Sequence, residues 1–294
     1  MKRIAIACTA LLVASVPARA QFLDLGRIIN KAVDVTQKTV EANREFTPEE
    51  EVALGQGIAA GILGAAPLDP DANLQRYVNR VGKWLAMNSE RPDLPWTFGV
   101  IEGDAVNAFA LPGGTVFVSR GLVNRLSSES ELAGVLGHEI AHVLLKHQLK
   151  AIQSAQASEV WTDLAKEGAS EAIGRRGGNV LGQELKSYGA KIGLEALKNG
   201  VFLRPLDRSM EYEADRLGMV VAARGGYDPY GLVAALQMLE QLKPDETGAS
   251  IMFSTHPAPA DRIAELEKFA PELDRYAGHP EVRARFRKVV GAAP

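Results

Sequence analysis

The sequence predicts an α+β fold that is mainly helical, with a small β-sheet placed directly before one long apolar helix. Three observations carry this prediction. Apolar residues recur at helical spacing through most of the chain. Three short β-prone runs follow one another at 96–101, 107–110 and 115–119. The apolar segment 128–150 then carries two histidines four residues apart.

The composition is that of an ordinary globular protein. The chain has 294 residues, 46% of them hydrophobic and 23% charged, and its net charge is -3. This balance gives no reason to expect nucleic acid as a partner. Cys8 is the single cysteine. We therefore expect any metal site to be built from histidines and carboxylates.

The N-terminus has the pattern of a secretory signal peptide. Lys2 and Arg3 precede an apolar run at 4–16, and an A-x-A sequence ends at Ala20. We expect residues 1–20 to be removed by a cut after Ala20. The mature chain would then lie in the periplasm and carry no transmembrane segment.

Two helices are expected before the sheet, after a helical N-terminal segment at 21–45. Thr47, Pro48 and Glu50 form a strong helix start, with Thr47 at the N-cap and Glu50 three positions later, and this helix should run to about residue 63. The next helix should span about 71–88.

Further helices are expected after the sheet. The turn at 112–114 joins the second and third strands, and Ser128 opens the apolar helix, which should continue to about Lys150. Residues 151–200 are helix-prone but rich in glycine. They fit either a lid or an ordinary helical hairpin. The remaining helices are expected at 206–224, 229–242, 257–268 and 280–290.

His138, Glu139 and His142 form the pattern H-E-x-x-H on the apolar helix. Residues i and i+4 share one face of a helix, so both imidazoles can reach the same metal ion. Glu139 can reach a water bound to that ion. Two histidines and an adjacent carboxylate are typical of zinc-dependent hydrolysis.

A catalytic zinc site usually has a third protein ligand, which here is expected among the residues after His142. Gln148 stands where a metzincin would have its third histidine. His147 would be out of phase with His138 and His142 on a continuous helix, so we expect it on the surface or on a second face. Glu211 and Asp215 share a face of the helix at 206–224. One of them can bind the metal while the other hydrogen-bonds a ligand histidine, and their spacing leaves both assignments open.

Four motifs in order resemble metallopeptidase family M48, which contains HtpX and the CAAX prenyl proteases, and especially its soluble periplasmic branch with BepA and LoiP. The resemblance covers about residues 45–270. Its motifs are N-A-F-A-L-P-G-G at 107–114, G-H-E-I-A-H at 137–142, R-x-x-E-x-E-A-D at 208–215 and S-T-H-P at 254–257. It implies a zincin-like metallopeptidase domain at 46–270, followed by a C-terminal helical tail at 271–294.

The resemblance also implies roles for particular residues. One Zn²⁺ per chain would be held by His138, His142 and Glu211, with Asp215 hydrogen-bonded to a ligand and Glu139 as the base. His256 would lie near the metal, where three roles are open: stabilising the oxyanion, covering the zinc, or capping the helix after it. Arg208 is expected either to pair with a carboxylate near the site or to be a surface charge.

The function expected from these features is that of a zinc endopeptidase acting on unfolded or misassembled envelope proteins. An extended peptide could add as a strand beside the edge formed by Asn107, Ala108, Phe109 and Ala110, or beside 115–119. Two alternatives stay open. One is a chaperone or a factor of the outer-membrane assembly machinery whose peptidase activity is latent. The other is a structural zinc site with His256 as fourth ligand.

Overall fold

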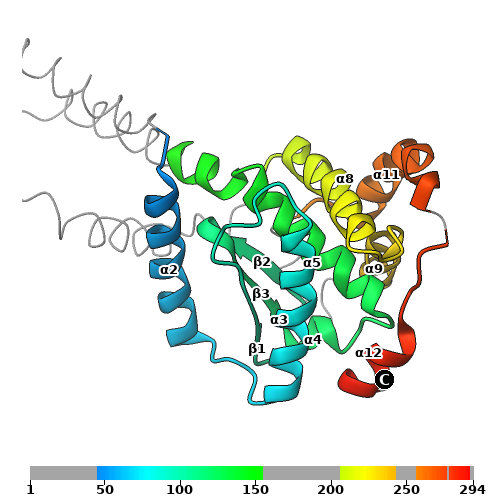
Figure 1. The fold of residues 1–294 in the computed structure, drawn as a ribbon, viewed down its shortest axis with the longest axis horizontal. Helices are drawn as coiled ribbons and strands as arrows, with labels where there is room; N and C mark the ends of the chain where they lie inside the picture. Colours follow the sequence, from blue (N-terminus) through cyan, green and yellow to red (C-terminus); the bar gives the residue numbers. More distant parts are fainter. Residues whose placement is uncertain (1–44, 155–205, 243–255, 277, 292–294) are drawn as a thin grey trace, which may run out of the picture. The chain divides into compact units, whose positions relative to one another are not determined.

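A computed structural model of the chain describes residues 45–154, 206–242, 256–276 and 278–291 (Figure 1). These residues all belong to one compact unit. The predicted signal peptide, the helical segment before residue 45 and most of the segment predicted at 151–200 lie outside the described residues. None of the described helices is both long and apolar enough to cross a membrane.

The two helices before the sheet begin where the sequence predicts. Helix α2 spans Pro48–Ala65, and its N-terminus is closed by a capping box in which Thr47 and Glu50 each bond the other's backbone N–H. Helix α3 spans Ala72–Met87 and is capped by Asp71, whose side chain accepts two backbone N–H groups.

The sheet has three strands in the order β1-β3-β2. Strand β1 spans Thr97–Ile101 and runs parallel to β3, Thr115–Ser119, while β2, Ala108–Leu111, runs antiparallel to β3. A 3₁₀ turn at Pro112–Gly114 joins β2 to β3, with both glycines at positive φ. Strand β3 is therefore interior, and β2 is an edge of the sheet within the described part of the chain.

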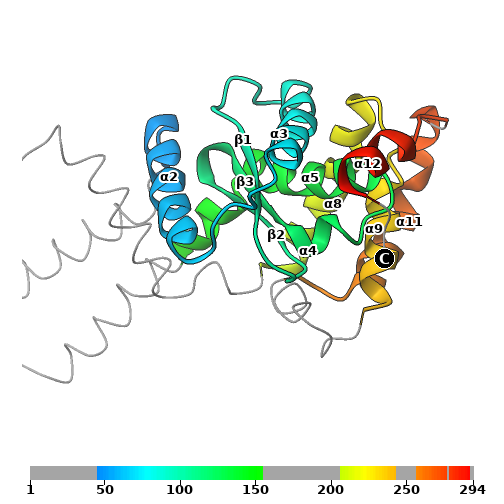
Figure 2. The same cartoon turned by 90° about the horizontal axis from the view of Figure 1, so that it is seen from below.

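Alternating side chains divide the core into two layers. Val116 and Val118 of β3 face the larger core, which contains the buried faces of α3 and α5, whereas Phe117 faces a smaller core built on α2. The strands accordingly lie between α2 and α5 (Figure 2). The short helix α4, Arg120–Val123, continues directly from β3.

Helix α5 spans Glu129–Leu144 and is capped by Ser128, as predicted. The prediction that it continues to about Lys150 is wrong. The helix breaks at Leu145 and Lys146, where Lys146 takes a left-handed conformation with φ 57°, and residues 147–154 are helical again. This break changes the direction of every side chain that follows it.

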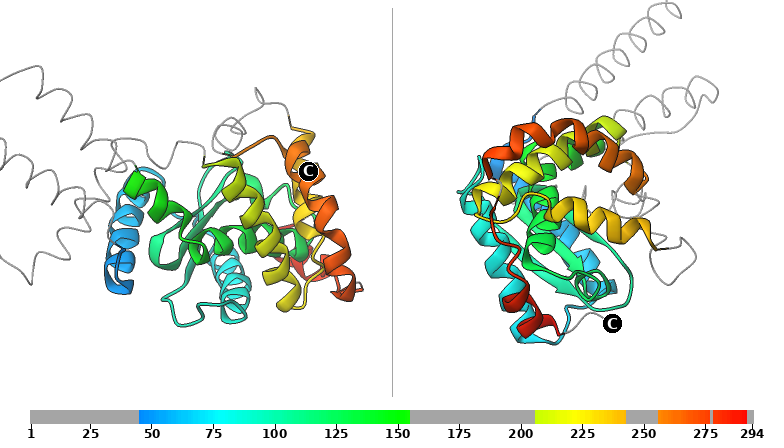
Figure 3. Two further views of the ribbon diagram at one scale, coloured as in Figure 1. Left: turned by 90° about the horizontal axis from the view of Figure 1, so that it is seen from above. Right: turned by 90° about the vertical axis from the view of Figure 1, so that its right-hand side faces the viewer.

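Two of the later helices pack directly on α5, the next packs on those two, and the last contacts both α3 and α5 (Figure 3). They are α8 at Arg208–Arg224, α9 at Gly231–Glu240, α11 at Pro259–Leu273 and α12 at Arg283–Val290, with a 3₁₀ turn at Asp274–Tyr276 before α12. Helix α11 starts two residues later than predicted.

Two glycines set the distance between α5 and α8. A Cβ on Gly218 of α8 would lie 2.7 Å from the backbone nitrogen of His138, and a Cβ on Gly137 of α5 would lie 2.6 Å from the carbonyl oxygen of Gly218. Only glycine fits at so close a backbone approach. The crossing therefore lies directly beside the H-E-x-x-H motif.

Candidate metal centre

The α5 helix holds His138 and His142 one turn apart, as the i,i+4 spacing requires. Both are buried, and their Nε2 atoms lie 3.0 Å apart. The two rings meet at 86°, edge to face. Both imidazoles therefore present Nε2 to the same small volume.

The close crossing of α5 and α8 adds two carboxylates. The oxygens of Glu211 lie 3.6 Å from Nε2 of His138 and 3.5 Å from Nε2 of His142. Asp215, one turn further along α8, lies on the other side of His138, with Oδ1 2.8 Å from Nδ1. A proton on Nδ1 is thus donated to Asp215, which leaves the lone pair of Nε2 directed toward Glu211.

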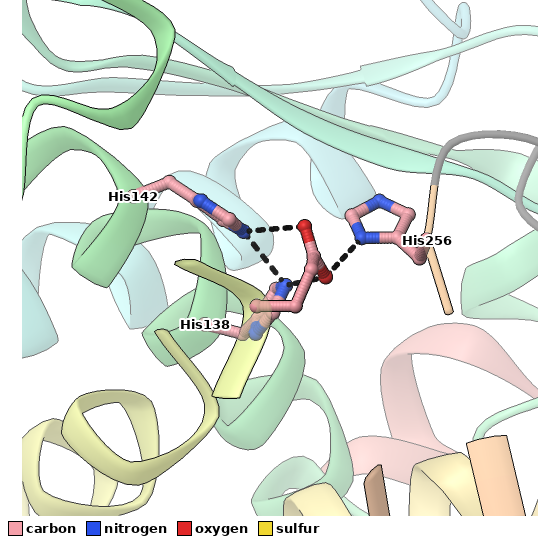
Figure 4. A group of neighbouring side chains, drawn as sticks. His138, His142 and His256 are labelled. Carbon is pink, nitrogen blue, oxygen red and sulfur yellow. Dashed lines mark hydrogen bonds and ion pairs between the residues drawn. The ribbon is translucent and has the colours of Figure 1, made fainter. Parts of the chain in front are cut away.

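His256 approaches the same carboxylate from the segment before α11. Its Nδ1 lies 2.6 Å from Oε2 of Glu211, so three imidazoles surround one carboxylate (Figure 4). The N-cap of α11 is Ala258 and has no side-chain hydrogen bond. The helix-capping role considered for His256 is therefore not the one it has in the structure.

This group fits a metal ion. Ligand atoms of His138, His142, Glu211 and His256 all lie within 4.8 Å of one another. Oε1 of Glu211 is buried and has no hydrogen-bond partner, which is costly for a carboxylate oxygen unless a cation is bound. Donors of a tetrahedral zinc site, at about 2.0–2.1 Å from the ion, lie roughly 3.3 Å apart. The separations of 3.0, 3.5 and 3.6 Å are close to that value.

Charges around the cluster decide which groups are ionised. Burial alone would raise the pKa of Glu211 and of Asp215, but His256 beside Glu211 and Arg262 beside Asp215 hold both pKa values well below their usual range. Burial lowers the pKa of His142. Both carboxylates are therefore anionic and His142 is neutral, as metal ligands must be.

Glu139 is buried next to the cluster, with 3% of its surface exposed. Burial raises its pKa, against the opposing charges of His138 and His256. A raised pKa brings a carboxylate closer to the range in which it can both take and return a proton near neutral pH.

Arg262 is a further residue of the site, which the sequence analysis did not predict. It is buried on α11, and its Nε and Nη2 lie 2.8 and 2.5 Å from the two oxygens of Asp215. A signal was available, because position 262 shares the apolar face of its helix with Leu266 four residues later. A charged residue there must have a buried partner.

Arg208 does not take part in the cluster. Its side chain is 72% exposed and lies 3.5 Å from Asp261. Of the two alternatives for Arg208, the structure agrees with the surface charge, and the arginine that pairs with a carboxylate of the site is Arg262.

The expectation for His147 was also wrong. His147 is fully buried, and its Nδ1 lies 2.9 Å from Nδ1 of His142. The expectation assumed a continuous helix, and the break at Lys146 turns His147 back toward His142. Burial, together with the charge of Lys150, lowers the pKa of His147 to about 4.

The four residues predicted to bind substrate lie at strand β2. Ala108 and Ala110 are buried in the larger core, whereas Phe109 faces the α2 side against Phe117. Asn107 just before the strand uses its backbone N–H and C=O to pair with Ser119 of β3.

Fold and site together define a class: a helical domain with a small sheet in which an H-E-x-x-H helix and a downstream glutamate form one cluster that can hold a metal ion. The sequence profile described as peptidase family M48 matches residues 72–270. The chain belongs to this family.

Curated relatives include two proteins called beta-barrel assembly-enhancing protease. The one from Yersinia pestis is 30% identical over 79% of this chain and 46% of its own length, and the one from Escherichia coli (strain K12) is 30% identical over 76% and 44%. The mitochondrial metalloendopeptidase OMA1 of Schizosaccharomyces pombe is 31% identical over 67% and 53%. The chain thus spans about half the length of the curated relatives it matches.

Proposed function

We propose that this chain is a zinc-dependent endopeptidase of the bacterial periplasm that hydrolyses unfolded or misassembled envelope proteins. The observation that carries the proposal is the cluster of His138, His142 and Glu211, in which Oε1 of Glu211 is buried without a hydrogen-bond partner. These three residues would hold the ion, and Asp215 would orient His138.

A zinc ion in this site would lower the pKa of a water to roughly 7 and polarise a peptide carbonyl. Glu139 would take the proton of the water and return it to the leaving amine. Its burial supports this role, because burial raises the pKa of the Glu139 carboxyl and so favours uptake of a proton. Arg262 would keep Asp215 ionised and in place.

His256 would act on the oxyanion of the tetrahedral intermediate. The carboxylate of Glu211, working against burial, raises the pKa of His256, which favours the protonated ring that can donate to an oxyanion. Its ring also packs 5.6 Å from that of His138, centroid to centroid. The same position allows His256 to cover the cluster while no substrate is present.

Strand β2 would receive the substrate. A peptide that adds beside Asn107, Ala108, Phe109 and Ala110 would be held by backbone hydrogen bonds, which recognise an extended chain rather than a particular sequence. The interior place of β3 leaves β2 as the better candidate of the two strands considered. Selection of extended chains suits unfolded proteins.

The chain would be exported to the periplasm and organised into successive segments. The signal peptide pattern at 1–20 supports export and cleavage after Ala20, with a helical segment at 21–45, the peptidase domain at 46–270 and a tail at 271–294. The name of the relatives from Yersinia pestis and Escherichia coli supports a link to outer-membrane assembly machinery.

A chaperone or assembly factor with latent peptidase activity is the second candidate. The contact of 2.6 Å between His256 and Glu211 favours it, because a ring at that place restricts access to the cluster. The third candidate, a closed structural zinc site, would use His256 as fourth ligand.

The three candidates separate in one set of assays. The purified mature protein is incubated with an unfolded protein such as reduced casein, with and without a chelator, beside Glu139→Gln and Glu272→Gln variants. An endopeptidase cleaves casein, loses activity with chelator and with Glu139→Gln, and keeps it with Glu272→Gln, since Glu272 is exposed.

Cleavage that appears only in a His256→Ala variant would favour the latent form. If no variant cleaves while every one retains zinc, the site is structural. If the Glu139→Gln protein fully restores a deletion strain, hydrolysis is not the main role in the cell.

A further inference from the structure

His147 lies behind His142 and faces it through a single pair of nitrogen atoms. The two Nδ1 atoms are 2.9 Å apart, the ring centroids 5.1 Å apart, and the rings cross at 70°. His147 is fully buried, so no water competes for this contact at its surface. The geometry is that of one N–H···N hydrogen bond.

The backbone puts His147 there through the break after α5. On a continuous helix, five residues turn by about 500°, which would leave His147 roughly 140° away from the direction of His142. The left-handed conformation of Lys146 interrupts this rotation and begins a new helix at His147. A non-glycine residue at positive φ carries strain that the surrounding contacts must offset.

The positions of the protons follow from the other contacts of His142. Its Nε2 faces Nε2 of His138 at 3.0 Å and Oε1 of Glu211 at 3.5 Å. A ligand histidine presents the lone pair of Nε2 to the cluster, so its proton is on Nδ1. Nδ1 of His147 must then be the acceptor of the hydrogen bond from His142 Nδ1–H, so His147 carries its own proton on Nε2.

The far nitrogen of His147 agrees with this assignment. Its Nε2 is buried without a hydrogen-bond partner and lies 3.7 Å from Oε2 of Glu213, a half-exposed carboxylate on α8. A proton on Nε2 is directed at this negative charge. The reverse arrangement would instead direct the lone pair of Nε2 at this carboxylate.

We propose that His147 is a positioning residue, which accepts the Nδ1–H of His142 and thereby fixes Nε2 as the nitrogen that His142 offers to a metal ion. The cluster then orients its two histidines by different means. Asp215 holds His138 with a charged carboxylate, and His147 holds His142 with a neutral ring. This inference rests on the proposed metal site and extends it by one residue behind the ligands.

Zinc affinity of three variants tests the proposal. His147→Leu fills the space without an acceptor, whereas Oδ1 of Asn in His147→Asn takes nearly the place of the imidazole Nδ1. Competition with a chromogenic chelator at pH 7 should show affinity reduced 10–100-fold in the Leu variant, the usual effect of losing such a partner, and largely restored in the Asn variant. His279→Asn, whose histidine bonds the backbone of Tyr227 instead, is the control and should match the wild type.

A purely structural role for His147 predicts the opposite order, because Leu preserves apolar packing better than Asn in a buried position. Wild-type affinity in His147→Leu, or equal losses in both variants, would overturn the proposal. Unfolding of the metal-free variants in urea separates these losses from a general loss of stability.

The proton positions are tested without any variant. Long-range ¹⁵N–¹H correlation spectra of the zinc-loaded wild-type protein should show His142 protonated on Nδ1 and His147 protonated on Nε2. A proton on Nδ1 of His147 in this protein would overturn the proposal even if the variants fail to fold. A wild-type protein that binds no zinc would instead refute the proposed function, so the two failures are distinguishable.

Discussion

Gly218 of α8 lies so close to His138 of α5 that a Cβ at position 218 would stand 2.7 Å from the backbone nitrogen and 2.8 Å from the Cα of His138. Both atoms belong to the backbone and cannot move aside without moving the helix. The separation of α5 and α8 therefore sets the distance from His138 to Glu211 and Asp215, which lie on α8.

We expect Gly218→Ala to push the two helices apart. The protein should lose about 1–3 kcal/mol of unfolding free energy, as in other overpacked cores, and its zinc affinity should fall at least tenfold. Urea unfolding and chelator competition measure the two effects. Gly64→Ala on α2 is the control, since a Cβ there meets no atom within 4 Å. A Gly218→Ala protein with normal zinc affinity would mean that the crossing does not position the ligands.

The pair of Asp215 and Arg262 should couple strongly in the folded protein. Both side chains are buried, so Arg262→Leu leaves a buried carboxylate without its cation, with His138 as its remaining partner, and should cost about 3–5 kcal/mol. Adding Asp215→Asn to this variant should recover part of the loss. A double-mutant cycle in urea, without metal, measures the coupling. The exposed pair of Lys268 and Glu265 provides the comparison and should give about 0–1 kcal/mol. Equal coupling energies for the two pairs would mean that Asp215 and Arg262 are not buried together in the folded protein.

Glu129 should make stability depend on pH in the acidic range. Burial alone would raise its pKa, but hydrogen bonds from Arg285, Tyr77 and Tyr227 lower the pKa below the ordinary 4.5. A carboxyl whose pKa is lower in the folded protein stabilises it above pH 4.5, and this contribution disappears as the pH falls through the folded pKa.

We therefore expect Arg285→Gln to be less stable than the wild type at pH 7, with a difference that shrinks below pH 4.5. Unfolding free energies measured from pH 7 to pH 3 check this. Arg283→Gln, which removes an exposed pair with Glu281, should show no such trend. A difference that stays constant down to pH 3 would argue against an ionised Glu129 in the fold.

Position 146 is expected to accept glycine more readily than any other amino acid. Its φ of 57° is strained for a side chain with a Cβ, so Lys146→Gly should stabilise the protein by up to about 1 kcal/mol. Lys146→Val should destabilise it, because a β-branched residue resists this conformation more strongly. Thermal unfolding of both variants is the measurement. Greater stability in the valine variant would mean that the helix is continuous in solution.

Local signals predicted much of this fold. Thr47 and Ser128 stand at the helix starts that they predicted, and short β-prone runs near prolines and glycines predicted the three strands. The break after α5 had no such signal, because neither glycine nor proline stands at 145 or 146. Tertiary contacts there override the local preference.

The residues of the candidate site likewise divide into those predicted by local spacing and those set by tertiary contacts. The i,i+4 spacing identified His138 with His142, and Glu211 with Asp215, because each pair lies on a single helix. Which of the two carboxylates faces the histidines depends on how α8 crosses α5, so spacing left it open and the family resemblance supplied Glu211. His147 and Arg262 were misplaced or missed, since their partners lie across a helix break or on another helix.

The candidate ligands come from two helices that are far apart in the sequence, with His256 supplied by a third segment. No short fragment of the chain carries the full set, so an ion bound here would be held only while α5 and α8 are packed together. Unfolding would release it, and binding would in turn stabilise the folded chain by mass action. The bound ion would therefore serve as a built-in probe of tertiary structure, and its rate of escape to a chelator would follow the opening of the α5–α8 crossing.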